Sequence, residues 1–252
     1  SGFFYIMKVA VIIIGRIDFL NKDNYNLNLS LFKDSDIFFH TDFDYKKEGM
    51  KLKPKDFIFT KPEVGNNIIK EYKNKYKLLH KRVEKLGLKN NIHYGHNFDR
   101  VVQWWRYNEC INEFKLQDYD YVVKWRTDAS KVYPLLTNSF ENLVEIYGSL
   151  KGYIEKQSFN KDHLYMFRDL IFFGSPEVIK KVDFYSNVED YIGNQNENIQ
   201  YSKSLIDKCD IKSGRFQWLE YENRPFLHLF SSETAMIKKV LSENIIIKDF
   251  FK

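Results

Sequence analysis

Polar side chains that could do chemistry stand directly after the most apolar segments of the sequence. In an open sheet flanked by helices, ligands bind outside the carboxyl ends of the parallel strands. Polar residues at these positions are therefore the first candidates for a binding or catalytic site. They are Gly15 and Arg16, then His40, Thr41, Asp42 and Asp44, then Arg126, Thr127 and Asp128, and finally Gly174 and Ser175.

The segment Arg126-Thr127-Asp128 follows an apolar run in mid-chain and places a cation beside an anion. A carboxylate at a strand end could bind a divalent cation, a hard ion that takes oxygen ligands and bridges phosphates. Arg126 could pair with a phosphate group or with the carboxylate itself. The alternative to a ligand site is a purely structural ion pair between Arg126 and Asp128.

Three pairs of aspartates have the spacing Asp-x-Asp, which is common by chance in a chain with this much aspartate. Two pairs precede predicted strands and are interpreted as turn residues. The third follows a strand and lies at the functional edge, where a solvated loop is the alternative. The first two pairs are Asp34/Asp36 and Asp118/Asp120, and the third is Asp42/Asp44.

The motifs of several large enzyme classes are absent from the sequence. Gly15 is not followed by the further glycines of a dinucleotide-binding GxGxxG, and neither a GxxxxGK[ST] loop nor a GxSxG nucleophile elbow occurs. Cys110 and Cys209 are far apart and form no CxxC, which favours a reducing compartment over a disulfide framework. The 39 basic and 34 acidic residues give a net charge of +5. Because this excess is small and dispersed, we expect no nucleic-acid partner.

The elements that must position these residues alternate between strands and helices. Residues 9–14 are apolar throughout, as in a strand buried on both faces. This alternation predicts an α/β fold with a mostly parallel central sheet flanked by helices. Further strands are expected at 35–40, 56–60, 118–125, 170–174 and 244–248, and helices at 66–86, 98–114, 141–150, from 176 onward, at 194–208 and at 231–241.

No repeat or linker divides the chain, so we expect a single domain over residues 1–252. Residues 1–6 are interpreted as a tag remnant or an extension, and residues 187–214 as a mobile insertion. The longest apolar run is far shorter than the roughly 18 residues of a membrane span. We therefore expect a cytoplasmic protein, in the host cytoplasm if it is viral. Its Lys-rich helix at 66–86 could make a peripheral membrane contact.

Several blocks of the sequence resemble, in order, the WavE-like and related glycosyltransferases of the GT-A type, found in bacterial surface-polysaccharide clusters and in large DNA viruses. The block at 119–128, YDYVVKWRTD, is similar to the core strand of that family. The other blocks are short, so their order along nearly the whole chain carries the resemblance. They lie at 8–16, 36–41, 103–110, 169–177 and 232–236.

The resemblance implies a GT-A-like (Rossmann-like) fold and transfer of a sugar from a nucleotide-sugar, UDP- or GDP-linked, to a glycan acceptor. It also implies a metal, Mn²⁺ or Mg²⁺, on the donor diphosphate. The family's Asp-x-Asp reads Arg126-Thr127-Asp128 here, which leaves Asp128 as the metal ligand. Asp169 and Glu233 are the implied catalytic residues, either of which could be the base. Donor binding falls to Gly15, Arg16, His40, Thr41, Asp42, Gln103 and Arg126.

Two other functions stay open at this point. The missing first aspartate of the motif favours a non-catalytic nucleotide- or carbohydrate-binding module that keeps the fold. A nucleic-acid-processing protein ranks last. The two catalytic candidates could also have purely structural roles. Glu233 could serve ordinary helix capping, and Asp169 could be a turn residue linked to Arg168.

Overall fold

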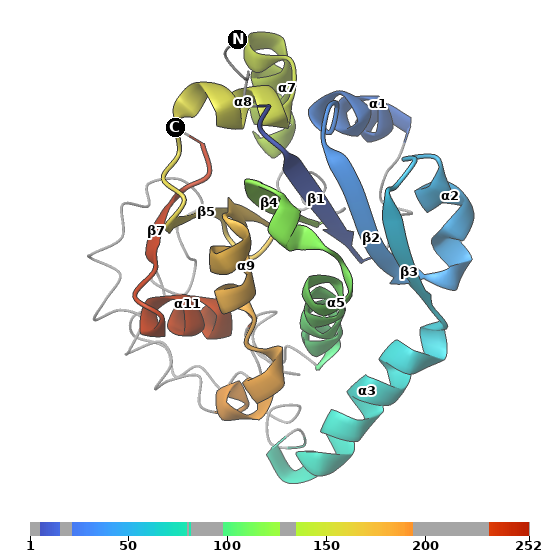
Figure 1. The fold of residues 1–252 in the computed structure, drawn as a ribbon. Helices are drawn as coiled ribbons and strands as arrows, with labels where there is room; N and C mark the ends of the chain where they lie inside the picture. Colours follow the sequence, from blue (N-terminus) through green and yellow to red (C-terminus); the bar gives the residue numbers. More distant parts are fainter. Residues whose placement is uncertain are drawn as a thin grey trace.

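The computed structural model describes residues 6–15, 22–79, 81, 98–126, 135–193 and 232–251. Its strands form one sheet of seven, in the order β3-β2-β1-β4-β6-β5-β7 (Figure 1). The strands are β1 (Val9–Ile14), β2 (Asp36–Asp42), β3 (Asp56–Thr60), β4 (Tyr121–Arg126), β5 (His163–Phe167), β6 (Ile171–Gly174) and β7 (Ile246–Asp249).

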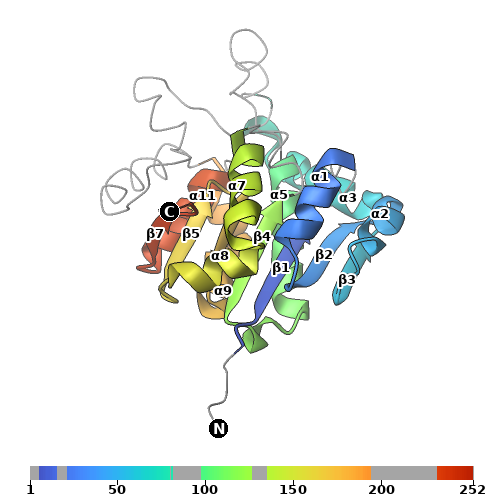
Figure 2. The same ribbon diagram turned by 90° about the horizontal axis from the view of Figure 1, so that it is seen from above.

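Helices cover both faces of this sheet (Figures 1 and 2). On one side lie α1, α7 and α8, and on the other α5, α9 and α11, while α3 packs against α5 and α2 lies beside the β3 edge. The helices are α1 (Lys22–Leu31), α2 (Lys46–Met50), α3 (Pro62–Lys75), α5 (Asp99–Glu113), α7 (Leu135–Tyr147), α8 (Leu150–Gln157), α9 (Pro176–Val182) and α11 (Ser232–Ser242), with 3-10 turns η2 (Phe43–Tyr45), η3 (Leu116–Asp118) and η4 (Tyr185–Tyr191).

Six of the seven strands run in one direction. Strands β1, β2, β3 and β4 are mutually parallel, β6 is antiparallel to both β4 and β5, and β7 is parallel to β5. The prediction of an α/β fold with a mostly parallel, helix-flanked sheet is confirmed.

The central strands alternate between two apolar cores. On β1, Ala10, Ile12 and Ile14 face the core under α5, α9 and α11, whereas Val9, Val11 and Ile13 face the core under α7 and α8. All six β1 side chains are buried, because a parallel strand covered on both sides has no polar face. This explains the unbroken apolar run at 9–14.

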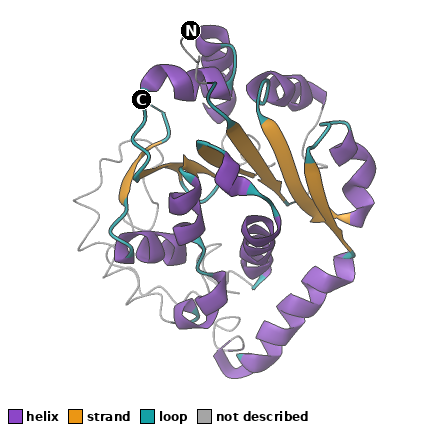
Figure 3. Ribbon diagram, in the orientation of Figure 1, coloured by secondary structure: helices purple, strands orange, loops and turns teal. Residues whose placement is uncertain are grey.

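The helix expected at 141–150 is confirmed over residues 141–147, which belong to α7, but its predicted end is wrong. The structure has two helices there, α7 and α8, with Gly148 and Ser149 between them. Figure 3 shows the helices in purple around the orange strands of the sheet. Gly148 has a φ of 75°, which glycine adopts without strain. Ser149 then caps α8 by accepting a hydrogen bond from the backbone N–H of Gly152 at 3.1 Å.

The hairpin of β5 and β6 includes a strand that the sequence prediction missed. Phe167 pairs with Ile171, so the turn holds only three residues, and its first residue, Arg168, has a φ of 56°. Because β6 runs against the other strands, this turn emerges at the carboxyl edge of the parallel strands. The hairpin thus delivers residues 168–170 to the edge where ligands bind in such sheets.

Part of the expected mobile insertion, residues 187–193, is described and ends η4 with Val188 and Tyr191 buried. The rest of that segment, and the helix expected at 194–208, lie outside the described residues. No helix in the described ranges is long and apolar enough to cross a membrane.

Candidate functional site

The order of the strands places a switch point between β1 and β4. The chain adds β2 and β3 on one side of β1 and then returns to add β4 on the other. Ile14, at the end of β1, lies opposite His40 on β2 and Arg126 on β4. In open sheets of this kind, the crevice at the carboxyl ends beside the switch point is the preferred binding position.

Gly15 turns the chain away from β1 at this point. Its backbone N–H donates to the carbonyl oxygen of His40 at 3.3 Å, and its φ of 108° favours glycine over any other residue. The following residue, Arg16, lies outside the described residues.

His40 is fully buried on β2, under α5. Its Nδ1 lies 3.4 Å from the backbone carbonyl oxygen of Arg106, and its ring meets that of Trp105 edge-on at 5.0 Å. Burial, together with the charge of Arg106, lowers the pKa of His40 to about 4, so the ring is neutral near pH 7. Donation from Nδ1 to the carbonyl leaves Nε2 as an acceptor, and Nε2 has no partner among the described residues.

Arg106 and Asp42 form a buried ion pair between α5 and the end of β2. Close by in the sequence, the hydroxyl of Thr41 and the amide nitrogen of Gln103 are buried without a partner among the residues described. Buried polar groups are nearly always hydrogen-bonded in proteins. Unsatisfied groups on β2 and α5 therefore mark this side of the switch point as a candidate ligand position.

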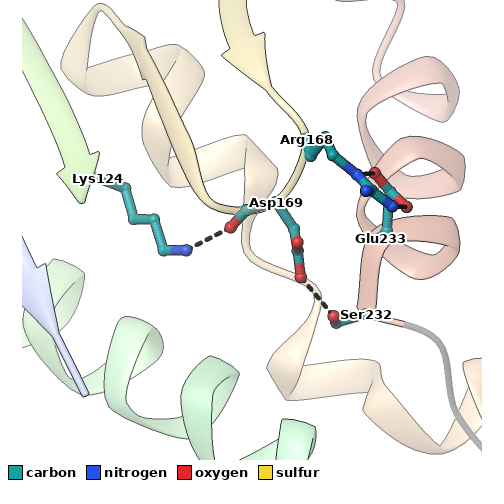
Figure 4. A network of polar contacts seen from close by, with 5 residues as sticks. All are labelled: Lys124, Arg168, Asp169, Ser232 and Glu233. Carbon is teal, nitrogen blue, oxygen red and sulfur yellow. Dashed lines mark hydrogen bonds and ion pairs between the residues drawn. The ribbon is translucent and has the colours of Figure 1, made fainter. Parts of the chain in front are cut away.

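A second polar group lies beyond β4, at the turn of the hairpin (Figure 4). Lys124 is fully buried on β4, and its ammonium donates to the carbonyl oxygen of Asp169 and, at 3.3 Å, to that of Leu170. A charge removed from water in this way is tolerated only with such acceptors. Lys124 therefore fixes the turn to β4.

The carboxylate of Asp169 faces the start of α11 and accepts a hydrogen bond from the Ser232 hydroxyl at 2.6 Å (Figure 4). Burial acts to raise the pKa of Asp169. The charges of Arg126, Lys124 and Arg100, with the bond from Ser232, outweigh burial and lower this pKa to about 2. Asp169 is consequently ionised at every physiological pH.

Glu233, the next residue of α11, is held by Arg168 from the same turn. The guanidinium donates from Nε to one carboxylate oxygen at 2.9 Å and from a terminal nitrogen to the other at 3.1 Å. Burial raises the pKa of Glu233, with Arg168 opposing and the Asp169 charge adding to the rise. Two adjacent buried carboxylates thus have pKa values shifted in opposite directions.

The predicted site residues fall into these two groups. His40, Thr41, Asp42 and Gln103 gather on β2 and α5, whereas Arg126, Asp169 and Glu233 gather around the hairpin turn, and Gly15 lies at the end of β1. Asp128, the predicted metal ligand, lies outside the described residues. Within the described ranges, no group of three His, Cys, Asp or Glu side chains is arranged to hold a metal ion.

Sequence reasoning missed Lys124, Ser232 and the pairing role of Arg106. The signal for Lys124 was present: it is the one charged residue inside the apolar run Tyr121–Trp125. A charge at such a position must find acceptors in the core. Which acceptors it finds depends on the hairpin, and the sequence prediction did not contain that hairpin.

A scan against models of protein families finds no match for this chain, and no curated protein matches it significantly. The function must therefore be argued from the site itself.

Proposed function

We propose that the protein is a glycosyltransferase of the GT-A type that transfers a sugar from a UDP- or GDP-linked donor to a glycan acceptor. One observation carries the proposal: the charged group at the carboxyl edge, next to the switch point. It combines four cations, Arg100, Lys124, Arg126 and Arg168, with two carboxylates, Asp169 and Glu233. An excess of positive charge at this position suits the diphosphate of a nucleotide-sugar.

The reaction needs this positive charge in the transition state. The acceptor hydroxyl forms a bond to the anomeric carbon while the bond to the diphosphate oxygen breaks, and negative charge grows on the leaving group. Cations that are already in place stabilise such charge without reorganising, and we assign this role to Arg100, Lys124 and Arg126. Arg126, at the end of β4, is our candidate for contact with the diphosphate. Lys124, whose ammonium is engaged by carbonyls, acts through its field.

An inverting transfer also requires a base for the acceptor hydroxyl. Asp169, with a pKa of about 2, is a weak base and suits charge balance. Glu233 has a raised pKa but is held at both oxygens by Arg168. We assign the base to Glu233, which accepts the proton once Arg168 turns toward the donor, and keep Asp169 as the residue that orders the turn.

A divalent cation, Mn²⁺ or Mg²⁺, belongs to the proposal with Asp128 as its ligand. Such an ion would neutralise the diphosphate when bound. The proposed setting is the cytoplasm. Gly15, His40, Thr41, Asp42 and Gln103 would contact the nucleoside part of the donor, where the unsatisfied groups on β2 and α5 supply acceptors and donors.

The second candidate is a nucleotide- or carbohydrate-binding module without catalysis. Two hydrogen bonds from Arg168 to Glu233 and one from Ser232 to Asp169 favour this candidate, because they show that both carboxylates are already engaged. The two functions differ in turnover and agree in ligand binding, so a single set of measurements separates them.

The experiment combines thermal unfolding with product analysis. UDP, GDP, CMP, dTDP and their sugars are screened with and without Mn²⁺. A ligand at 100 times its dissociation constant stabilises the fold by about 2.7 kcal/mol. Stabilisation by one nucleotide, with release of that nucleotide from its sugar, is the expected result.

Variants then assign the roles. Glu233→Gln is expected to abolish turnover and keep binding. The control is Glu243→Gln, which changes a partly exposed carboxylate on the turn after the same helix, where it pairs with Lys239. Binding without turnover in the wild-type protein would favour the binding module. A flat screen for every nucleotide would overturn the transferase and the metal role of Asp128, and would leave carbohydrate binding as the remaining form of the second candidate.

A further inference from the structure

Three phenylalanines form a compact cluster at the β3 edge of the sheet. Phe43 follows β2 in η2, and Phe57 and Phe59 lie on β3; we call these three the aromatic edge patch. The ring centroids of Phe57 and Phe59 are 4.9 Å apart, and those of Phe43 and Phe59 are 6.2 Å apart. Phe43 is 55% exposed and Phe57 is 40% exposed. Clusters of this kind on a protein surface mark interaction sites more often than single exposed side chains do.

The aromatic edge patch is supported from below by a buried ring of the core. Phe39, fully buried on β2, stacks on Phe57 at 5.9 Å and meets Phe59 edge-on at 5.3 Å. The space behind the exposed rings is therefore filled, and the rings cannot retract. An exposed apolar surface that its own core keeps in place is available to a partner.

The segment that carries the patch is also the basic part of the chain, so the expectation that the positive excess is dispersed is wrong. Residues 43–81 contain eleven lysines, no arginine and five acidic residues, for a net charge of +6, compared with +5 for the whole protein. Lys46 lies over the rings of Phe43 and Phe59. Lys47, Lys51, Lys53 and Lys61 are likewise exposed, whereas the ammonium of Lys55 is paired with the carboxylate of Asp36 at 2.7 Å. The acidic residues nearest in sequence are Asp44, Glu48 and Asp56.

Exposed large apolar residues concentrate in the same segment. Of the nine found among the described residues, five lie between 43 and 78: the two patch residues Phe43 and Phe57, with Met50, Val64 and Leu78. In Figure 1, α2, β3 and α3 lie together at one side of the molecule. Apolar and cationic side chains are thus displayed by neighbouring elements.

We propose that this surface docks onto an anionic lipid bilayer, with the aromatic edge patch entering the interface and the lysines binding the headgroups. Aromatic rings partition into the interfacial region, and clustered lysines are attracted to acidic leaflets. The inference does not depend on the proposed function, since docking requires no sugar transfer. It extends the membrane contact expected at helix 66–86 to the segment before that helix, which carries the aromatic edge patch.

Two other occupants fit less well. A second copy of the chain, paired through the β3 edge, would bring two segments of +6 together. A nucleic acid would need ring faces for base stacking. Here Phe57 is already stacked on Phe39, and Lys46 covers Phe43 and Phe59. A bilayer requires only apolar volume surrounded by positive charge.

The test is co-sedimentation of the whole chain with vesicles of phosphatidylcholine alone or of phosphatidylcholine with phosphatidylserine. We expect binding to the acidic vesicles only, weakened by salt. Phe43→Ser with Phe57→Ser is expected to reduce binding at least about tenfold. The matched control replaces two exposed isoleucines elsewhere, Ile146→Ser with Ile246→Ser, and should bind as the wild type does.

A variant that spares the rings guards against misfolding of the phenylalanine variant. Lys46→Gln with Lys47→Gln changes only exposed side chains and should lower affinity for acidic vesicles. Equal binding to both vesicle types, or undiminished binding by the phenylalanine variant, would overturn the proposal. Tighter binding of a single-stranded oligonucleotide than of acidic vesicles would also overturn it. The same holds for a dimer in solution that dissociates in the phenylalanine variant.

Discussion

Arg168 donates to both carboxylate oxygens of Glu233, at 2.9 Å and 3.1 Å, and so joins the β5–β6 turn to the first turn of α11. Both side chains are about nine-tenths buried. Removing one member of such a pair leaves a buried charge without a partner. We expect Arg168→Gln to lower the free energy of unfolding by about 3–5 kcal/mol.

The double variant Arg168→Gln with Glu233→Gln separates pairing from side-chain loss. Because it removes both charges, we expect it to be more stable than Arg168→Gln alone. Urea unfolding of the four proteins in this cycle gives the coupling free energy. A coupling near zero would mean that the pair contributes no more than an exposed ion pair does.

His40 makes a pH dependence measurable. Its pKa is about 4 in the folded protein, and 6.5 is the ordinary value that it would have when unfolded. Below pH 6.5 the unfolded chain therefore binds the proton first, so stability falls as the pH drops toward 4 and is unaffected by this residue above 6.5. The full effect is about 3 kcal/mol.

His40→Asn keeps a donor near the position of Nδ1 and cannot titrate in this range. We expect the unfolding free energy of this variant to fall less than that of the wild type between about pH 7 and about pH 4.5. His163→Asn, a partly buried histidine on β5, serves as the control. Parallel pH profiles for the wild type and His40→Asn would contradict the assignment.

Lys124 stabilises the hairpin turn through two carbonyl oxygens and through the Asp169 carboxylate. Lys124→Met keeps the length of the side chain and removes every donor. We expect a loss of about 2 kcal/mol of unfolding free energy, since two buried acceptors lose a donor. Lys151→Met, which breaks an i,i+4 pair with Glu155 on α8, should change stability by less than about 0.5 kcal/mol. Equal effects at both positions would refute the role of Lys124.

Gly174 is the last residue of β6, at a position where a side chain has no room. A Cβ there would lie 2.8 Å from a methyl group of Val178 and 3.2 Å from the carbonyl oxygen of His163. We expect Gly174→Ala to cost about 1–3 kcal/mol through overpacking. At Gly65, in α3, a Cβ would meet a methyl group of Val102 at 3.3 Å, and the gain in helix propensity offsets that contact. Thermal unfolding should therefore separate the two variants, and equal melting temperatures would contradict the packing at Gly174.

The fold was predictable where one rule decided the outcome. The apolar run at 9–14 could only be a strand buried on both faces, and β1 has those bounds. Strand β5 was missed because His163–Phe167 is short and lies only three residues before β6, and Asp169 alone did not identify a hairpin turn between them. Gly148 marked a helix break only in combination with the Ser149 cap.

The site was predictable as a set of residues and not as an arrangement. Strand-end reasoning selected His40 and Arg126, which lie on either side of the end of β1. It could not bring Asp169 to Ser232, which is 63 residues further along the chain, because that contact depends on the reversed direction of β6. The burial that shifts the pKa values of Asp169 and Glu233 in opposite directions is likewise a property of the packed fold.

The bond from Lys124 to the hairpin turn also constrains the order of folding. Its acceptors lie 45 and 46 residues downstream. When β4 leaves the ribosome, these acceptors have therefore not yet been synthesised. The parallel half of the sheet cannot close around a desolvated ammonium until the hairpin has been synthesised and has docked. Structure formation therefore waits for long-range contacts, as in other folds dominated by them. A fragment that ends at β4 should remain unfolded.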